Sequence, residues 1–214
     1  MIILSAFNKG GVGKTTLAVH VAGLLAETGR VLLVDCVDQY DAFSFYCRQV
    51  PKKELEPQRA KEHERLIVVW NPGQERITKL VELDTYEHIV LDINSPNKDT
   101  VKGIVENEPD IILLPINDQA LAIDKLGDTL GIVAAMQKIN YHSKVKIVPL
   151  GATKTRIEEC LAQIAVKPKN LQMTRRINKH PKEFSDALRT GQFVWNYKGC
   201  AYIRSILQNT INGY

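Results

Sequence analysis

Short, continuous apolar runs recur along this sequence and constrain its fold more than any other feature. Strands that are apolar on both faces, without alternation, are typical of a parallel sheet covered by helices on both sides. We therefore expect an α/β fold with a mostly parallel sheet, formed as a single domain over residues 1–214. The strands are expected at residues 2–6, 31–34, 66–70, 89–91, 111–114, 144–148 and 171–174.

Two other segments carry expectations about local structure. Leu17, Val21, Leu24 and Leu25 recur at helical spacing, which predicts an amphipathic helix that Gly29 closes. Residues 51–65 are highly charged and interrupt the strand pattern, so we expect an exposed helix or loop there.

A phosphate-binding loop follows the first expected strand. Residues 8–16 read Asn-Lys-Gly-Gly-Val-Gly-Lys-Thr-Thr and open the first expected helix, which is the order of elements in a P-loop. Glycines let backbone N–H groups surround phosphate oxygens, and the helix N-terminus adds partial positive charge. Lys14 would reach the β- and γ-phosphates, and the Thr15 hydroxyl would ligate Mg²⁺. The nucleotide-binding residues expected here are Gly10, Gly11, Val12, Gly13, Lys14, Thr15 and Thr16.

Charge is distributed unevenly along the chain. The net charge is only +4, but residues 1–137 hold 14 basic and 20 acidic side chains, whereas residues 138–214 hold 14 basic and 4 acidic ones. Such asymmetry indicates either a solvated surface or a face for a polyanion. No apolar run is long enough for a membrane-spanning helix and no signal peptide is evident, so we expect a cytoplasmic protein.

Lys9, one residue before Gly-Gly, gives the loop a second lysine. The sequence Lys-Gly-Gly-Val-Gly-Lys-Thr-Thr resembles the deviant Walker A box of the ParA/MinD family of ATPases, and the resemblance extends over nearly the whole chain. It implies a P-loop NTPase fold that uses ATP and Mg²⁺. It also implies a homodimer that sandwiches two ATP molecules, in which Lys9 reaches the partner's phosphates, as an arginine finger does in trans.

The resemblance also assigns roles to acidic residues and one further lysine. Asp92 ends a strand similar to the family's Walker B strand and would hold Mg²⁺, although a carboxylate at a strand end can also cap the next loop. Asp35 ends the strand that leads into the family's Asp-x-Asp segment, where Val37 occupies the place of the second aspartate. We expect Asp38 to orient the attacking water, with Asp35 the next candidate and also a member of the Mg²⁺ shell. Lys154 lies where the family places adenine-contacting residues.

The beginning of the chain resembles the short ParA branch, which includes small plasmid-partition ATPases and the McdA proteins that space carboxysomes. This implies nonspecific binding to nucleoid DNA and a ParB-like or McdB-like adaptor that stimulates hydrolysis. The C-terminal segment has one cation beside its apolar stripe, so we expect a packed helix rather than a membrane anchor. A P-loop enzyme that uses ATP to activate a small molecule remains the alternative. The expected DNA contacts are Arg175, Arg176, Lys179, Lys182 and Arg189, each of which could equally be a solvated surface residue.

Overall fold

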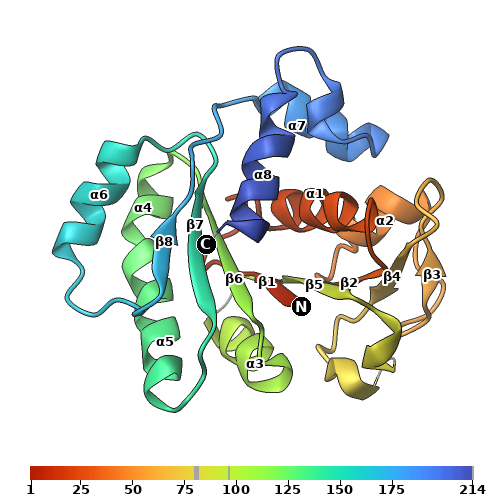
Figure 1. Ribbon diagram of the computed structural model, residues 1–214, viewed down its shortest axis with the longest axis horizontal. Helices are drawn as coiled ribbons and strands as arrows, with labels where there is room; N and C mark the ends of the chain where they lie inside the picture. The colour runs from red at the N-terminus through yellow and green to blue at the C-terminus, as the bar shows by residue number, and fades with distance from the viewer. Residues whose placement is uncertain (80–81, 96, 214) are drawn as a thin grey trace.

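A sheet of eight strands forms the centre of the computed structural model, which describes residues 1–79, 82–95 and 97–213 (Figure 1). The strands lie in the order β3-β4-β2-β5-β1-β6-β7-β8, and all neighbours pair in parallel except β3 and β4. Their bounds are β1 Ile2–Ser5, β2 Val31–Cys36, β3 Gln58–Arg59, β4 Leu66–Trp70, β5 His88–Ile93, β6 Ile111–Ile116, β7 Lys144–Pro149 and β8 Leu171–Met173. The predicted α/β fold with a mostly parallel sheet is therefore confirmed.

Of the two alternatives expected for residues 51–65, the loop is the one that forms, and it contains the unexpected strand β3. The two residues of β3 pair antiparallel with β4 and protect that edge of the sheet. The first helix ends earlier than expected, at Ala26, and Glu27 is its C-cap. Gly29 lies beyond this end and donates its N–H to Leu25 O at 3.0 Å.

Helices cover both faces of the sheet, as the apolar strands require. One face packs against α1 Lys14–Ala26, α2 Asp41–Cys47, α7 Pro181–Thr190 and α8 Tyr202–Asn212. The other packs against α3 Asn97–Asn107, α4 Ala120–Asp124, α5 Leu126–Lys138 and α6 Lys154–Gln163. Within the described residues, short 3₁₀ helices occur at Ile77–Lys79, Leu83–Thr85 and Val194–Asn196.

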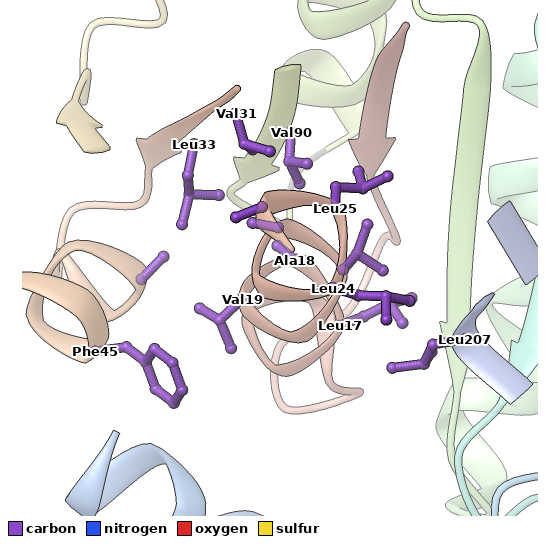
Figure 2. Close-up of a cluster of buried hydrophobic side chains, with 14 of the residues drawn as sticks. Leu17, Ala18, Val19, Leu24, Leu25, Val31, Leu33, Phe45, Val90 and Leu207 are labelled. Atoms are coloured by element: carbon purple, nitrogen blue, oxygen red, sulfur yellow. The ribbon is translucent and has the colours of Figure 1, made fainter. Parts of the chain in front are cut away.

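Helix α1 is buried on nearly all sides because α2, α7 and α8 pack over it. Side chains from α1 point toward the strands on one side, toward Phe45 of α2 on another and toward Leu207 of α8 on a third (Figure 2). Gly23 is essential to this packing: a Cβ there would lie 2.1 Å from Phe193 Cζ. This helix begins directly at the phosphate-binding loop, so its burial fixes the loop against the sheet.

Helix α8 is held by a buried lysine. Lys146 on β7 donates to Thr210 O at 2.6 Å and Gly213 O at 2.8 Å, which supplies donors to carbonyls at the C-terminal end of the helix. The apolar stripe of the helix, Ile203, Ile206, Leu207 and Ile211, is buried. The expected packed terminal helix is thus confirmed. No helix in the described part of the chain is long and apolar enough to cross a membrane.

Candidate functional site

The loop of residues 8–13 connects β1 to α1 at the carboxyl edge of the sheet. Gly11 and Gly13 have φ of 71° and 108°, values that residues with a Cβ rarely adopt. A Cβ on Gly13 would also lie 2.5 Å from Leu150 Cδ1, in the loop after β7. The two glycines therefore allow the loop to curve and turn its backbone N–H groups toward a common centre at the start of α1, which is an anion-binding geometry.

Lys14, the first residue of α1, is buried within this loop. Its Nζ donates to Lys9 O at 3.1 Å and to Ser95 Oγ at 2.7 Å. Burial lowers the pKa of Lys14, while the nearby Asp92 carboxylate raises it in part. Burial removes water from the Lys14 ammonium, and only neutral oxygens take its place. A multiply charged anion bound here would stabilise the ammonium more strongly than these oxygens do.

Ser95 was not predicted as a site residue. The stretch of sequence after β5 carries no recognisable motif at this position. Its only sequence signal is position, three residues after Asp92, at the edge where parallel strands end. Its hydroxyl meets Lys14, a partner 81 residues away in the chain.

Two buried aspartates lie side by side at the carboxyl ends of β2 and β5. The register pairs Asp35 with Asp92, and Asp92 in turn with Ser5 of β1. Both carboxylate oxygens of Asp92 are buried and have no hydrogen-bond partner among the described residues. Burial, together with the charge of Asp35, raises the pKa of Asp92 well above its usual range, and the facing Thr15 hydroxyl acts in the opposite direction.

Asp35 differs from Asp92 because its oxygens have backbone partners. Oδ1 accepts from Val37 N at 3.0 Å, and Oδ2 accepts from Phe43 N at 2.8 Å in the first turn of α2. Burial raises the pKa of Asp35 to about 6 although these backbone bonds lower it. The side chain therefore fixes the conformation of the loop that follows β2.

Asp38 lies at the exposed corner of a turn in that loop. Tyr40 N donates to Val37 O at 3.0 Å, which places Asp38 and Gln39 at the centre of the turn, while the Val37 side chain is buried. The Asp38 carboxylate is therefore accessible, and its role in orienting water remains a prediction. Asp35 and Asp38 differ in what they can do: one is fixed by backbone donors and the other is free to face a bound group.

Lys9 lies at the outer side of the phosphate-binding loop. Its Nζ donates to Gln119 Oε1 at 2.5 Å and to Gly10 O at 3.2 Å. Gln119 comes from the segment between β6 and α4, which Asn117 also anchors by donating to Gly11 O at 3.0 Å. Neither Asn117 nor Gln119 was predicted as a site residue, because their contacts with the loop span more than 100 residues of sequence.

The loop after β7 forms another wall of the site. Leu150 packs against Gly13, and Lys154 opens α6 four residues later. Lys154 itself is exposed and forms an ion pair with Glu158 at 3.5 Å. In the same region Arg176 donates to Gly151 O at 2.9 Å. The segment after β8 therefore reaches the wall of the phosphate-binding loop.

The five cations expected to bind DNA do not form one set of free side chains. Arg176 is bonded to the loop after β7, Lys179 forms an ion pair with Asp118, and Arg189 forms one with Asp186 at 3.1 Å. Arg175 and Lys182 are exposed. All five belong to the segment from the end of β8 to the end of α7, so they share one region at the C-terminal part of the fold.

Together, the strand–loop–helix geometry, the buried lysine and the paired aspartates define a P-loop nucleotide-binding domain. The family model described as the CobQ/CobB/MinD/ParA nucleotide-binding domain matches residues 3–192. The chain therefore belongs to this family, as the sequence predicted. No curated protein sequence gave a significant match.

Solved structures share the fold at low sequence identity. Apo McdA from Cyanothece has a TM-score of 0.78 and 15% identity, with 99% of each chain covered. A plasmid partition protein from Borrelia burgdorferi bound to AMPPNP has a TM-score of 0.73 and 20% identity, with 100% of this chain and 99% of that chain covered. MinD in the Aquifex aeolicus MinC:MinD complex has a TM-score of 0.73 and 17% identity, with 100% and 96% covered. These likenesses establish the ParA/MinD fold.

Proposed function

We propose that this protein is a ParA-type ATPase whose ATP-bound dimer binds nucleoid DNA nonspecifically and positions a cytoplasmic cargo. The observation that carries the proposal is the pair of lysines at the phosphate-binding loop. Lys14 already supplies the buried cation that a P-loop needs, whereas Lys9 lies at the outer side with its Nζ on a neighbouring loop. A second cation outside a complete loop is suited to the phosphates of a second subunit.

The residues present fit ATP and Mg²⁺. Asp92 offers two buried carboxylate oxygens without a partner among the described residues, and Thr15 faces them. Within the described ranges no three acidic, histidine or cysteine side chains cluster as a metal site, so Mg²⁺ would need phosphate and water ligands as well. That is the usual arrangement for Mg²⁺ in nucleotide-binding sites. Thr15 and Asp92 would hold the ion, with Asp35 behind them in its shell, and the ion would neutralise phosphate charge.

Hydrolysis needs an oriented water and neutralised charge rather than covalent chemistry. We assign the orientation of the water to Asp38, because its carboxylate is exposed at the loop after β2 while backbone donors hold both oxygens of Asp35. Lys14 and Lys9 would neutralise the charge that develops on the phosphate oxygens. Lys154, the first residue of α6, would contact the base.

The carboxylate assignment is tested by single alanine variants measured for both ATP binding and ATP turnover. Asp38→Ala should bind ATP normally and hydrolyse it on the order of 100-fold more slowly, as expected when a reacting group loses its position. Glu54→Ala, which removes an exposed carboxylate in the loop between α2 and β3, is the control and should keep the parent rate. Parent-rate hydrolysis by Asp38→Ala, together with loss of turnover in Asp35→Ala, would assign the role to Asp35.

Dimerisation is tested by light scattering in defined nucleotide states. With ATP and Mg²⁺ the mass should double, whereas ADP should leave a monomer, and Lys9→Ala should remain monomeric in both. The same mass in every nucleotide state would contradict the dimer.

DNA binding rests on the basic C-terminal part of the chain, which carries 14 basic and 4 acidic residues from position 138 onward. We expect DNA binding that depends on ATP but not on DNA sequence. The logarithm of its association constant should fall with the logarithm of the salt concentration, with a slope of roughly −0.9 per phosphate contact. Arg175→Glu combined with Lys182→Glu removes two exposed cations to which we assign no role in nucleotide binding, and should abolish DNA binding while the dimer persists. Normal binding by that variant would exclude this surface.

The proposal extends to a cargo and an adaptor, for which the structural relatives suggest the class. The plasmid partition protein and McdA share the fold, so a plasmid, a chromosome or a protein compartment such as the carboxysome is the class of cargo proposed. A ParB-like or McdB-like adaptor would stimulate hydrolysis. The alternative is an enzyme that uses ATP to activate a small molecule. It would be identified if ATP turnover required a small-molecule acceptor and did not respond to DNA together with an adaptor protein.

A further inference from the structure

The segment between β6 and α4 is hydrogen-bonded to the phosphate-binding loop at two positions. Gln119 Oε1 accepts from Lys9 Nζ at 2.5 Å, and Asn117 Nδ2 donates to Gly11 O at 3.0 Å. Asn117 Oδ1 also accepts from the backbone N–H of Gln119 at 3.2 Å, so the Asn117 side chain holds the backbone from which Gln119 extends. We name residues 117–119 the clamp segment.

The outer side of the clamp segment is also held. Asp118 O accepts from Arg156 at 2.9 Å, and the Asp118 carboxylate pairs with Lys179. The clamp segment is thereby fixed between the phosphate-binding loop, α6 and the connection from β8 to α7. Because these contacts order the backbone, Gln119 presents its amide to Lys9 without a large loss of conformational entropy.

Gln119 occupies the N-cap position of α4 but does not cap it. The backbone of Gln119 is extended, and its side chain makes no capping hydrogen bond to the first turn. Glutamine is also outside the group of residues favoured at this position, which are Ser, Thr, Asp, Asn and Gly. The side chain instead contacts Lys9, so its local role in the helix does not explain it.

We propose that Gln119 is a positioning residue that holds Lys9 on its own subunit and thereby sets the threshold for dimer formation. The proposal rests on the proposed role of Lys9 across the dimer. To reach the phosphates of a partner, Lys9 must leave Gln119 Oε1 and Gly10 O, so each contact stabilises the monomer. Every dimer releases two lysines, and the effect on the association constant is therefore squared.

The test compares two substitutions that are expected to change the dimer association constant in opposite directions. Gln119→Leu keeps much of the side-chain size and removes the acceptor, whereas Gln119→Glu replaces a neutral acceptor with a charged one. A single hydrogen bond of ordinary net strength corresponds to about fivefold in an equilibrium constant. Gln119→Leu should therefore raise the ATP-dependent dimer association constant about 25-fold. Gln119→Glu should lower it, because the carboxylate would form an ion pair with the Lys9 ammonium where the amide is only a neutral acceptor.

A matched control separates the contact from the added charge. Gln163→Glu places the same charge at the exposed C-terminal end of α6, at the opposite end of that helix from Lys154. It should leave the association constant unchanged. Affinity for ATP is measured in parallel with a fluorescent analogue, and dimerisation is compared at saturating ATP, so that altered nucleotide binding does not mimic the effect.

A second measurement needs no dimer. Acetylation of nucleotide-free protein, followed by mass spectrometry, gives the labelling rate of Lys9 relative to exposed Lys182. Gln119→Leu should raise this ratio several-fold and Gln119→Glu should lower it. If the wild type dimerises with ATP and both variants have the same association constant as the wild type, the role of Gln119 is overturned while the dimer stands. Wild-type protein that stays monomeric with ATP overturns the proposed dimer and this role with it.

Discussion

Replacing His20 by glutamine tests how the helix after the phosphate-binding loop is connected to the C-terminal part of the fold. His20 Nδ1 donates to Thr16 O at 2.6 Å, and Nε2 accepts from Val194 N at 2.9 Å. This pair of bonds requires the neutral ring with its proton on Nδ1. The rings of Phe184 and Trp195 contact His20 edge-on, with centroids 5.8 and 5.4 Å away, so no water can reach a charged imidazolium.

The size of the effect follows from the pKa of this histidine. Burial lowers the pKa of His20 from 6.5 to about 4 in the folded protein. In the window between these values the unfolded chain binds a proton that the folded chain does not, so unfolding takes up a proton and stability falls as pH falls. The linkage relation gives a loss of about 2 kcal/mol between pH 7 and pH 5, and about 3 kcal/mol by pH 4.

This loss can be measured by urea unfolding of the wild type and of His20→Gln, followed by circular dichroism at pH 7, 6 and 5. The quantity compared is the difference in unfolding free energy between the two proteins at each pH. Taking the difference removes the contribution of Asp35, whose raised pKa acts in the opposite direction and is common to both. At pH 7 the wild type should be more stable, and its advantage should shrink by about 2 kcal/mol at pH 5. An advantage that is constant across this range, or a His20 ring that titrates near 6.5 by NMR in the native state, would refute the reasoning.

Three further substitutions are expected to change either the free energy of unfolding, measured in the same way, or the affinity for ATP, measured by titration. Gly23→Ala should destabilise the fold by about 2 kcal/mol or more, because its Cβ would meet Phe193, while the control Gly131→Ala, in open space on α5, should be neutral or stabilising. Gly13→Ala should weaken ATP binding at least about tenfold with little loss of secondary structure, since its φ of 108° excludes a Cβ; unchanged affinity would contradict the loop geometry. Lys146→Met should cost about 2 kcal/mol by leaving Thr210 O of α8 and Gly213 O at its C-cap without their donor, and parent stability would show that the lysine does not anchor the helix.

The central strands could be predicted from the sequence because burial on both faces leaves an unbroken apolar run. The segments at 31–34, 66–70 and 111–114 each became the core of a strand with bounds within two residues. Strand β3 could not be predicted, since its two residues, Gln58 and Arg59, are polar and too few to show a hydrophobic alternation. They pair only because β4 offers a free edge. The bounds of α1 were missed for a related reason, because tertiary contacts rather than the glycine determine where it ends.

The candidate site divides in the same way between local and distant contacts. The phosphate-binding loop is a contiguous motif, so its residues could be named from the sequence. Ser95 and Gln119 meet the two lysines of the loop across 81 and 110 residues, and no local pattern marks them. The five expected DNA contacts were grouped by charge alone, and charge does not reveal that Arg176 is bonded to Gly151 O.

The position of β1 within the sheet has a consequence for how the protein matures during synthesis. β1 precedes the other strands of this sheet in the chain and pairs with β5 and β6, with Ile3 opposite Val90 on one side and Ile111 on the other. The phosphate-binding loop follows β1 directly and depends on its placement, so the loop cannot be fixed before residues 88–116 have been synthesised. Because such distant pairings form slowly, nucleotide capture by the growing chain marks a late step in folding.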